Sequence, residues 1–178
     1  MEIKMYITQE SLRGDLLDFV AMDWTLVWPG PPQPGDRKFF AWCEQFGWEA
    51  TEYTWGLEMR TRHGSTIDLY KGIGGLRTIG INGPCSFRSS DPGEKSLVKE
   101  TSDSYWNEYL RTTSDVLGEP QWSGTAGDPS FPEPPAPGIW EVPESAQDVP
   151  HRLAAWSRIG GGQEAPYIVL RQSFTIAY

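Results

Sequence analysis

The chain has 178 residues, of which 13% are aromatic, and carries a net charge of −9. That length buries a core without disulfides or metal, and nine tryptophans exceed what a disordered chain carries, so we expect one folded domain. The first residues lack the charged and apolar regions of a signal peptide, and no long apolar run follows. We therefore expect a cytoplasmic protein that does not insert into a membrane.

Acidic side chains are concentrated in one quarter of the chain. Residues 112–151 hold seven of them and no lysine or arginine. Nucleic-acid binding requires basic side chains that displace counterions from phosphates, so we do not expect it. An acidic segment is suited to steering a basic protein partner, although excess charge also serves solubility alone.

Two short helices are predicted in the N-terminal part, after an extended arm or edge strand over residues 1–7. Thr8 is a suitable N-cap for the first helix, although Gly14 weakens that prediction. Its apolar stripe comprises Leu12, Leu16, Phe19 and Val20. Residues 23–28 are predicted to be a short extended piece, and the proline-rich residues that follow exclude regular structure. The second helix begins after Asp36, ends at Gly47, and displays Phe39, Phe40, Cys43 and Phe46.

After the second helix the period of the sequence changes to two. We predict strands over residues 48–60, 66–70 and 76–81, and the alternation in the first of them indicates one wet and one buried face. Glycine-containing turns at residues 62–65 and 72–75 join them into an antiparallel meander.

The strongest helix signal lies in residues 95–120, after a polar loop over residues 86–94. Apolar and aromatic side chains recur there at spacings of three and four for about six turns. Gly118 and Pro120 end the helix, because glycine supplies a left-handed cap and proline cannot continue a helix. The stripe comprises Leu97, Val98, Thr101, Tyr105, Tyr109, Thr113, Val116 and Leu117.

The segment over residues 121–150 is rich in proline and cannot supply a central strand. It nevertheless contains Trp122, Phe131, Ile139 and Trp140. We interpret it as a surface loop pinned by these aromatic and apolar side chains, with a partly disordered insertion as the alternative. Residues 152–159 and 166–178 are predicted to form a hairpin.

Together these elements predict a single α+β domain over residues 1–178. Its antiparallel sheet, formed by the three-stranded meander and the C-terminal hairpin, packs against one long helix and two shorter N-terminal helices. The proline-rich acidic segment at residues 121–150 is a surface loop within that domain.

No motif for a cofactor survives comparison with the context it requires. The glycines at residues 72–75 and 160–162 are followed by strand-like residues, whereas a phosphate loop opens directly into a helix. His63 and His151 have no partners at ligand spacing, so we expect surface histidines and no metal site. We therefore predict no cofactor.

Catalytic side chains are not indicated either. Cys43 shares a helical face with aromatic residues and is expected in the core, whereas the role of Cys85 stays open. The carboxylate pairs Glu49/Glu52 and Glu58/Asp68 suit glycoside chemistry by residue type, but a wet sheet face carries such residues anyway. We predict that the chain is not an enzyme.

Several tryptophans lie in or beside proline-rich loops, among them Trp28. Exposed aromatic residues beside acidic ones are typical of protein-binding hot spots, and the alternative is that each covers the edge of a small core. The predicted partner-binding residues are Trp122, Asp128, Glu133, Trp140, Glu141, Glu144 and Asp148.

Two short signatures carry a resemblance to a known group. They are Met22-Asp23-Trp24 with the later Phe46-Gly47-Trp48, and Val116-Leu117-Gly118-Glu119-Pro120. Over residues 8–120 and 152–178 the chain resembles small α+β proteins of unknown function, common in actinobacteria, that are encoded beside secreted polymorphic toxins. The resemblance implies an immunity protein whose partner is a toxin domain encoded nearby, and it implies no catalytic residues.

The first functional hypothesis is therefore a non-catalytic cytoplasmic protein that neutralises a toxin by covering its active site. Toxins that act on nucleic acid present basic clefts, to which an acidic surface is complementary. One alternative is a small-ligand-binding or enzymatic α+β domain with a pocket between the sheet and the proline-rich loops. A secretion-chaperone-like protein is the other.

Overall fold

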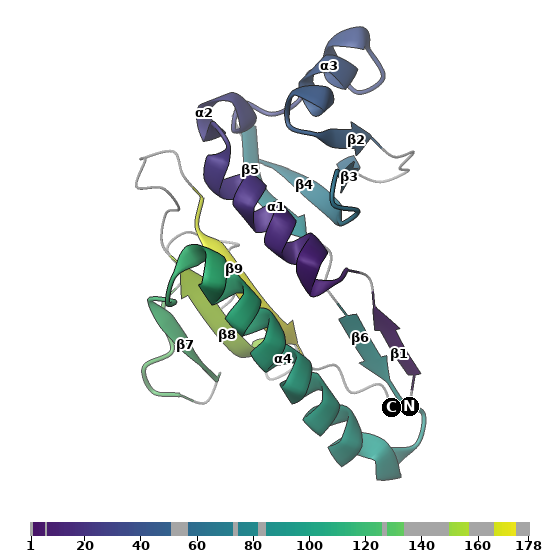
Figure 1. The fold of residues 1–178 in the computed structure, drawn as a ribbon, viewed down its shortest axis with the longest axis vertical. Coiled ribbons are helices and arrows are strands. Elements are labelled where there is room, and N and C mark those ends of the chain that lie inside the picture. Colours follow the sequence, from purple (N-terminus) through teal and green to yellow (C-terminus); the bar gives the residue numbers. More distant parts are fainter. Residues whose placement is uncertain are drawn as a thin grey trace. The chain divides into compact units, whose positions relative to one another are not determined.

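The structure is a computed structural model, and it describes residues 2–5, 7–50, 57–72, 75–81, 85–125, 128–133, 150–156 and 166–173. The chain divides into two compact units, Met1–Val116 and Leu117–Tyr178. We call them the N-terminal unit and the C-terminal unit. Figure 1 shows their helices and strands in sequence colours.

The N-terminal unit begins with a two-stranded antiparallel ribbon. β1 (Glu2–Met5) pairs with β6 (Cys85–Arg88), so the predicted edge strand at the start of the chain is confirmed. The polar loop predicted over residues 86–94 is wrong in its first part. The two strands of this ribbon are far apart in sequence. The residues around β6 therefore do not indicate that it pairs with β1.

The first predicted helix is confirmed as α1 (Gln9–Ala21), which runs through Gly14. Thr8 caps it, because its hydroxyl accepts a hydrogen bond from the Ser11 backbone N–H at 3.0 Å. The buried face comprises Leu12, Asp15, Leu16 and Phe19. Val20 was expected in the apolar stripe but is 41% exposed, so the buried face is narrower than the pattern suggests.

The extended piece predicted over residues 23–28 is wrong, because a one-turn helix, α2 (Trp24–Val27), forms there. The Asp23 carboxylate accepts a hydrogen bond from the Thr25 N–H at 3.1 Å and caps it. The Trp24 indole N–H donates to the Phe19 carbonyl at 3.0 Å. A single turn is too short to show helical periodicity, so its cap was the only available signal.

The second predicted helix is confirmed as α3 (Arg37–Gln45). The Asp36 carboxylate accepts from the Phe39 N–H at 2.7 Å, and Gly47 ends the helix with a φ of +68°. Phe39 and Cys43 are buried, whereas Phe40 is 55% exposed.

The meander is confirmed and extended by one strand. Its sheet has the order β2-β3-β4-β5, and every neighbouring pair is antiparallel. The strands are β2 (Trp48–Ala50), β3 (Leu57–Thr61), β4 (Thr66–Gly72) and β5 (Gly75–Ile81). The alternation over residues 48–60 therefore belongs to two strands rather than one. Alternation alone does not reveal a reversal of the chain within it.

The inner face of this sheet and the turn after β3 follow from the sequence pattern. Met59 and Ile67 have no exposed area and lie opposite each other in the register of β3 and β4. Gly64 supplies a φ of +89° in the predicted turn, where its N–H donates to the Thr61 carbonyl at 3.0 Å.

The long helix is confirmed as α4 (Lys95–Leu117), preceded by the short 3₁₀ helix η1 (Pro92–Glu94) and ended by Gly118 at a φ of +80°. Its buried face was only partly predicted. That face comprises Ser102, Trp106, Tyr109, Thr112 and Thr113. Leu97 is 48% exposed, so the first turns contribute less to the core than their apolar residues suggest.

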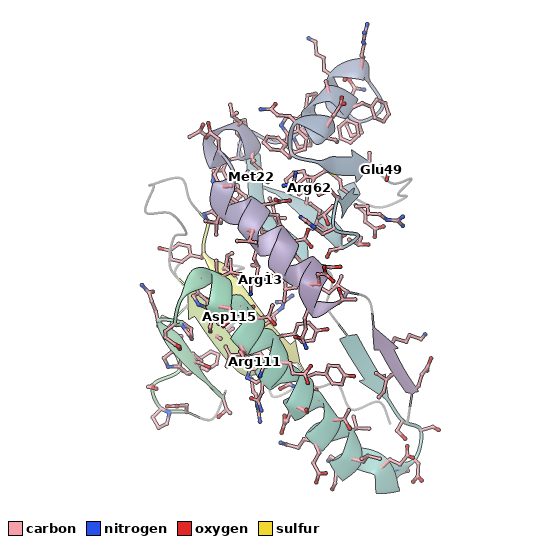
Figure 2. The ribbon with its side chains drawn as sticks, viewed as in Figure 1. Arg13, Met22, Glu49, Arg62, Arg111 and Asp115 are labelled. Atoms are coloured by element: carbon pink, nitrogen blue, oxygen red, sulfur yellow. The ribbon has the colours of Figure 1, made fainter. Side chains whose placement is uncertain are left out.

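α4 is tied to the beginning of the chain. The Tyr109 hydroxyl donates to the Ile7 carbonyl at 3.1 Å, and the bond is buried. Closer to the end of α4, Asp115 forms an exposed ion pair with Arg13 of α1 at 3.7 Å (Figure 2). The buried hydrogen bond contributes more to stability than the ion pair, which water and salt screen.

The C-terminal unit is a three-stranded antiparallel sheet in the order β7-β8-β9. The predicted hairpin is confirmed as β8 (Pro150–Trp156) and β9 (Ile168–Ser173). The surface loop predicted over residues 121–150 is wrong at its start, because β7 (Trp122–Thr125) pairs with β8. β7 lies at one edge of this sheet and contains no proline. Pro150, the last residue of the segment, opens the central strand β8, a first position that proline tolerates.

The fold class is α+β, as predicted, with the described strands in three antiparallel sheets rather than in one. The core of the N-terminal unit includes the inner face of its four-stranded sheet, and that of the C-terminal unit includes Leu153, Ala154 and Trp156. Among the helices in the described part of the chain, none combines the length and the apolarity required to cross a bilayer.

Candidate partner-binding surface

A hydrogen-bonded group of aromatic and acidic side chains lies at and after β7. The Asp128 carboxylate accepts from the Ser130 backbone N–H at 2.8 Å and from the Ser130 hydroxyl at 2.7 Å. The Trp122 indole N–H donates to that hydroxyl at 3.2 Å. The Trp122 ring meets the Phe131 ring edge-on, with centroids 5.1 Å apart. We call these four residues the acidic–aromatic cluster.

The electrostatics of the cluster favour a fixed negative charge. Hydrogen bonds from the side chain and then the backbone of Ser130 lower the pKa of Asp128 below its usual value. The carboxylate is therefore ionised at neutral pH and held in one orientation. A charge held in this way loses less conformational freedom on binding than a free side chain does.

A glycine makes room for the tryptophan. A Cβ at Gly124 would lie 2.8 Å from Cζ2 of Trp122 and 3.3 Å from Oδ2 of Asp128. Any larger residue at that position would displace the ring or the carboxylate. Gly124 is thus a structural requirement of the cluster. Sequence reasoning missed it because a glycine in a strand can also mark a bulge or simply a weaker strand.

Three of the seven predicted partner-binding residues lie in the described part of the chain. Trp122 and Asp128 belong to the cluster, and Glu133 follows it with an exposed side chain. The other four are Trp140, Glu141, Glu144 and Asp148, which lie outside the described residues. Ser130 and Phe131 were not among the predicted residues, although a serine two positions after an aspartate is a common turn signal.

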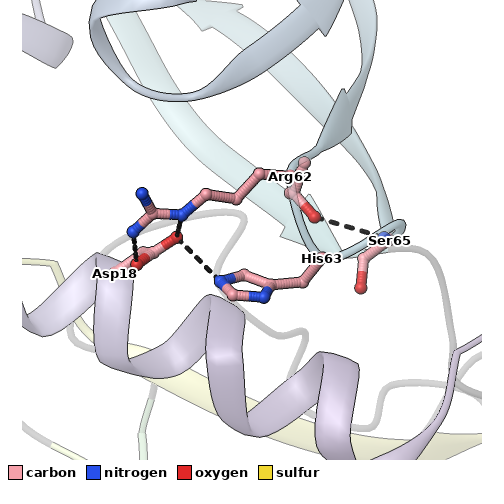
Figure 3. A network of polar contacts seen from close by, with 5 residues as sticks. Asp18, Arg62, His63 and Ser65 are labelled. Carbon is pink, nitrogen blue, oxygen red and sulfur yellow. Dashed lines mark hydrogen bonds and ion pairs between the residues drawn. The ribbon is translucent and has the colours of Figure 1, made fainter.

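A second polar network, in the N-terminal unit, was not predicted (Figure 3). Asp18 of α1 accepts two hydrogen bonds from Arg62, one from Nε at 2.7 Å and one from Nη2. The same carboxylate lies 3.1 Å from Nε2 of His63. Both partners belong to the turn between β3 and β4, which the Ser65 N–H helps to shape by donating to the Thr61 hydroxyl. We call Asp18, Arg62 and His63 the Asp18 network.

Glycine and burial also shape this network. A Cβ at Gly14 would lie 2.5 Å from Nδ1 of His63, so the imidazole ring rests against the backbone of α1. The hydrogen bonds and charge of Asp18, and the charge of Asp15, raise the pKa of Arg62. Asp15 is 1% exposed, and neither of its carboxylate oxygens has a hydrogen-bond partner among the described residues.

Chemically, the Asp18 network joins α1 to the turn between β3 and β4. His63 was expected to be a surface histidine, yet its side chain is 33% exposed and its Nε2 faces a carboxylate. Arg62 is 63% exposed, but both its Nε and Nη2 are engaged. The network therefore orients the turn on α1.

The remaining sequence candidates whose side chains the structure describes lie in the N-terminal unit. Cys43 is buried, which raises the pKa of its thiol, and its Sγ lies 3.9 Å from Sδ of Met59. This confirms core packing. Glu58 and Asp68 lie opposite each other in the register of β3 and β4. Glu52 and the side chains of Cys85 and His151 lie outside the described residues.

The glycine run at residues 72–75 was considered as a phosphate loop. Its described residues belong to strands, because Gly72 is the last residue of β4 and Gly75 the first residue of β5. Residues 160–162 lie outside the described part. Within the described ranges, no three histidine, cysteine, aspartate or glutamate side chains are grouped so that they could hold a metal ion.

Compared with known proteins, the chain matches no family model, no curated protein and no solved structure. The acidic–aromatic cluster and the Asp18 network are therefore interpreted from their own chemistry. Of the two, only the cluster combines a half-buried tryptophan, a fixed carboxylate and a strongly acidic sequence neighbourhood. It is the better candidate for binding a partner.

Proposed function

We propose that this chain is a non-catalytic binding protein, and that it neutralises a toxin domain by covering its active site. The observation that carries the proposal is the acidic–aromatic cluster within the most acidic quarter of the chain. Residues 112–151 contain seven acidic side chains and no basic ones. The cluster presents a tryptophan, the residue type most enriched at binding hot spots, beside a fixed carboxylate.

The charge of this segment indicates the kind of partner. A concentrated negative charge attracts a basic surface over roughly one Debye length, about 8 Å at physiological salt. Enzymes that act on nucleic acids present such basic surfaces to phosphates. An acidic protein that binds there competes with the substrate for the same charges, which is a simple route to inhibition.

Co-expression with the protein encoded immediately upstream of this chain tests the proposal. Growth of the host is compared with and without this chain, and the two proteins are then co-purified. We expect the neighbour to be toxic, this chain to restore growth, and a stable complex to form. A harmless neighbour, or restored growth without a complex, would contradict the proposal.

Charge reversal tests the electrostatic part within such a complex. Lysine at Asp128, Glu133, Glu141, Glu144 and Asp148 should slow association on the order of tenfold or more at low salt, because long-range attraction governs encounter. The measurement is the association rate constant by stopped flow at several salt concentrations.

A matched pair of single variants provides the control. Glu133→Lys and Glu100→Lys make the same change at exposed glutamates, one beside the cluster and one on α4. Only Glu133→Lys should slow association. Equal effects of both variants would show that net charge, rather than this surface, steers the partner.

A further inference from the structure

A shallow groove of about 530 Å³ lies in the N-terminal unit between α3 and the β2–β3 pair. α3 contributes Phe40 and Glu44 to its lining, and the strands contribute Trp48, Glu49 and Arg60, with Arg62 directly after β3. All of these belong to one compact unit. The groove therefore has an aromatic part and charges of both signs.

The charges of the groove do not cancel evenly. Arg62 is already bound through two of its nitrogens to Asp18, and its side-chain stem passes within 3.5 Å of the position of a Cβ at Gly47. Arg60 lies directly opposite Glu49 in the register of β2 and β3, so these two opposite charges are cross-strand neighbours. Among the described residues, Glu44 has no opposite charge within ion-pair distance.

Phe40 and Glu44 are placed to act on the same group. They lie one turn apart on α3, and side chains four residues apart on a helix are neighbours. Both are exposed, and Phe40 retains 55% of its accessible area. The Phe39 ring packs edge-on against Phe40, with centroids 5.6 Å apart, which limits the positions that the exposed ring can take.

Trp48 forms the fixed part of this wall. It is 5% exposed and contacts the rings of Trp42 and Phe46, with centroids 5.5 and 5.2 Å away. A cation between Phe40 and Glu44 would meet an aromatic ring and a carboxylate together, and both can attract it. An anion would meet the Glu44 carboxylate, which has no opposite charge within ion-pair distance among the described residues.

We propose that this groove binds a lysine or arginine side chain of a partner protein, held between the Phe40 ring and the Glu44 carboxylate. A side chain of a partner protein suits the site, because the groove is shallow and both Phe40 and Glu44 are exposed. A protein surface can therefore reach both residues from solvent. The proposal goes beyond the acidic–aromatic cluster and does not depend on it.

The test is an NMR titration of the full chain with N-acetyl-arginine amide, which carries one guanidinium and no other charge. We expect saturable shifts at the backbone amides of Phe40 and Glu44 and at the Trp48 indole N–H. N-acetyl-glutamine amide and acetate serve as neutral and anionic probes. Equal shifts with acetate, or no localised shifts with the arginine probe, would overturn the proposal.

Two variants locate the binding site. Glu44→Gln keeps the shape of the side chain and should weaken binding of the arginine probe about 2–5-fold, as should Phe40→Ala. Glu100→Gln on α4 makes the same change at another exposed glutamate and should leave the affinity unchanged. Unchanged affinity in Glu44→Gln would refute the assigned role of its carboxylate. Because no toxin is used, failure here and failure of the co-expression experiment are separate results.

Discussion

Two glycines in this protein lie directly beneath a ring, Gly14 beneath His63 and Gly124 beneath Trp122. In the C-terminal unit the ring belongs to the same strand as its glycine, two positions away. In the N-terminal unit the ring comes from the turn between β3 and β4. At both sites a glycine allows a ring to approach the backbone closely. Strand geometry places the Trp122 ring at Gly124, whereas tertiary packing places the His63 ring at Gly14.

The comparison shows which contacts can be predicted from neighbouring residues and which cannot. Residues two apart in a strand share a face, so Trp122 above Gly124 follows from local geometry. His63 and Asp18 are 45 residues apart, and nothing near either residue specifies the other. Only the packing of the turn on α1 brings the imidazole to Gly14.

The largest effect is expected at the long-range site. Gly14→Ala should lower the free energy of unfolding by about 1–3 kcal/mol, because its Cβ would overlap the His63 ring. In an open helix interior the same change would stabilise by about 1 kcal/mol, so the sign itself is informative. Urea unfolding monitored by circular dichroism measures it.

A double variant separates the overlap from other causes. Gly14→Ala combined with His63→Ala removes the ring that the new methyl group meets. The double variant should therefore be more stable than Gly14→Ala alone, with a coupling energy of about 0.5–3 kcal/mol. Additive losses would show that His63 is not what makes glycine necessary.

A smaller effect is expected at the local site. Gly124→Ala should displace the Trp122 ring from Asp128 and cost about 1 kcal/mol or less, because β7 is an edge strand and Trp122 is only half-buried. Near-ultraviolet circular dichroism and indole N–H chemical shifts report the displacement. Ser123→Ala, an exposed neighbour in the same strand, is the control and should leave both signals unchanged. An unperturbed Trp122 signal in Gly124→Ala would contradict the close approach.

The smallest effect concerns pH. The pKa of Asp128 is lowered in the folded chain, so its contribution to stability is present above the unfolded value of about 3.9 and is lost as the pH falls through the folded value. The Tm difference between the wild type and Asp128→Asn should therefore be constant above about pH 5 and shrink toward acid. A difference that grows as the pH falls would reverse the sign of the argument. The Tm difference is measured by thermal unfolding of both proteins at a series of pH values from neutral down through the folded pKa of Asp128.

Local sequence signals were sufficient to predict an element wherever its caps, its stop or its periodicity lie within the element itself. Thr8 and Asp36 as caps, Gly47 and Gly118 as stops, and the alternation of Met59 with its wet-face neighbours all act within a few residues. Helices α1, α3 and α4 and the meander were predicted for this reason. The predicted cluster residues Trp122 and Asp128 were found through composition and charge in the same local way.

The sequence by itself determined the α+β class, the three main helices, the meander, the C-terminal hairpin and the acidity of one quarter of the chain. Tertiary structure decided the pairing of β1 with β6, the addition of β7 beside β8, and the joining of Asp18 to Arg62 and His63. The physical reason is that caps, stops and periodicity depend on neighbours along the backbone. Strand partners and ion pairs depend on which distant segments come into contact, and the sequence pattern around a single residue does not show which segments these are.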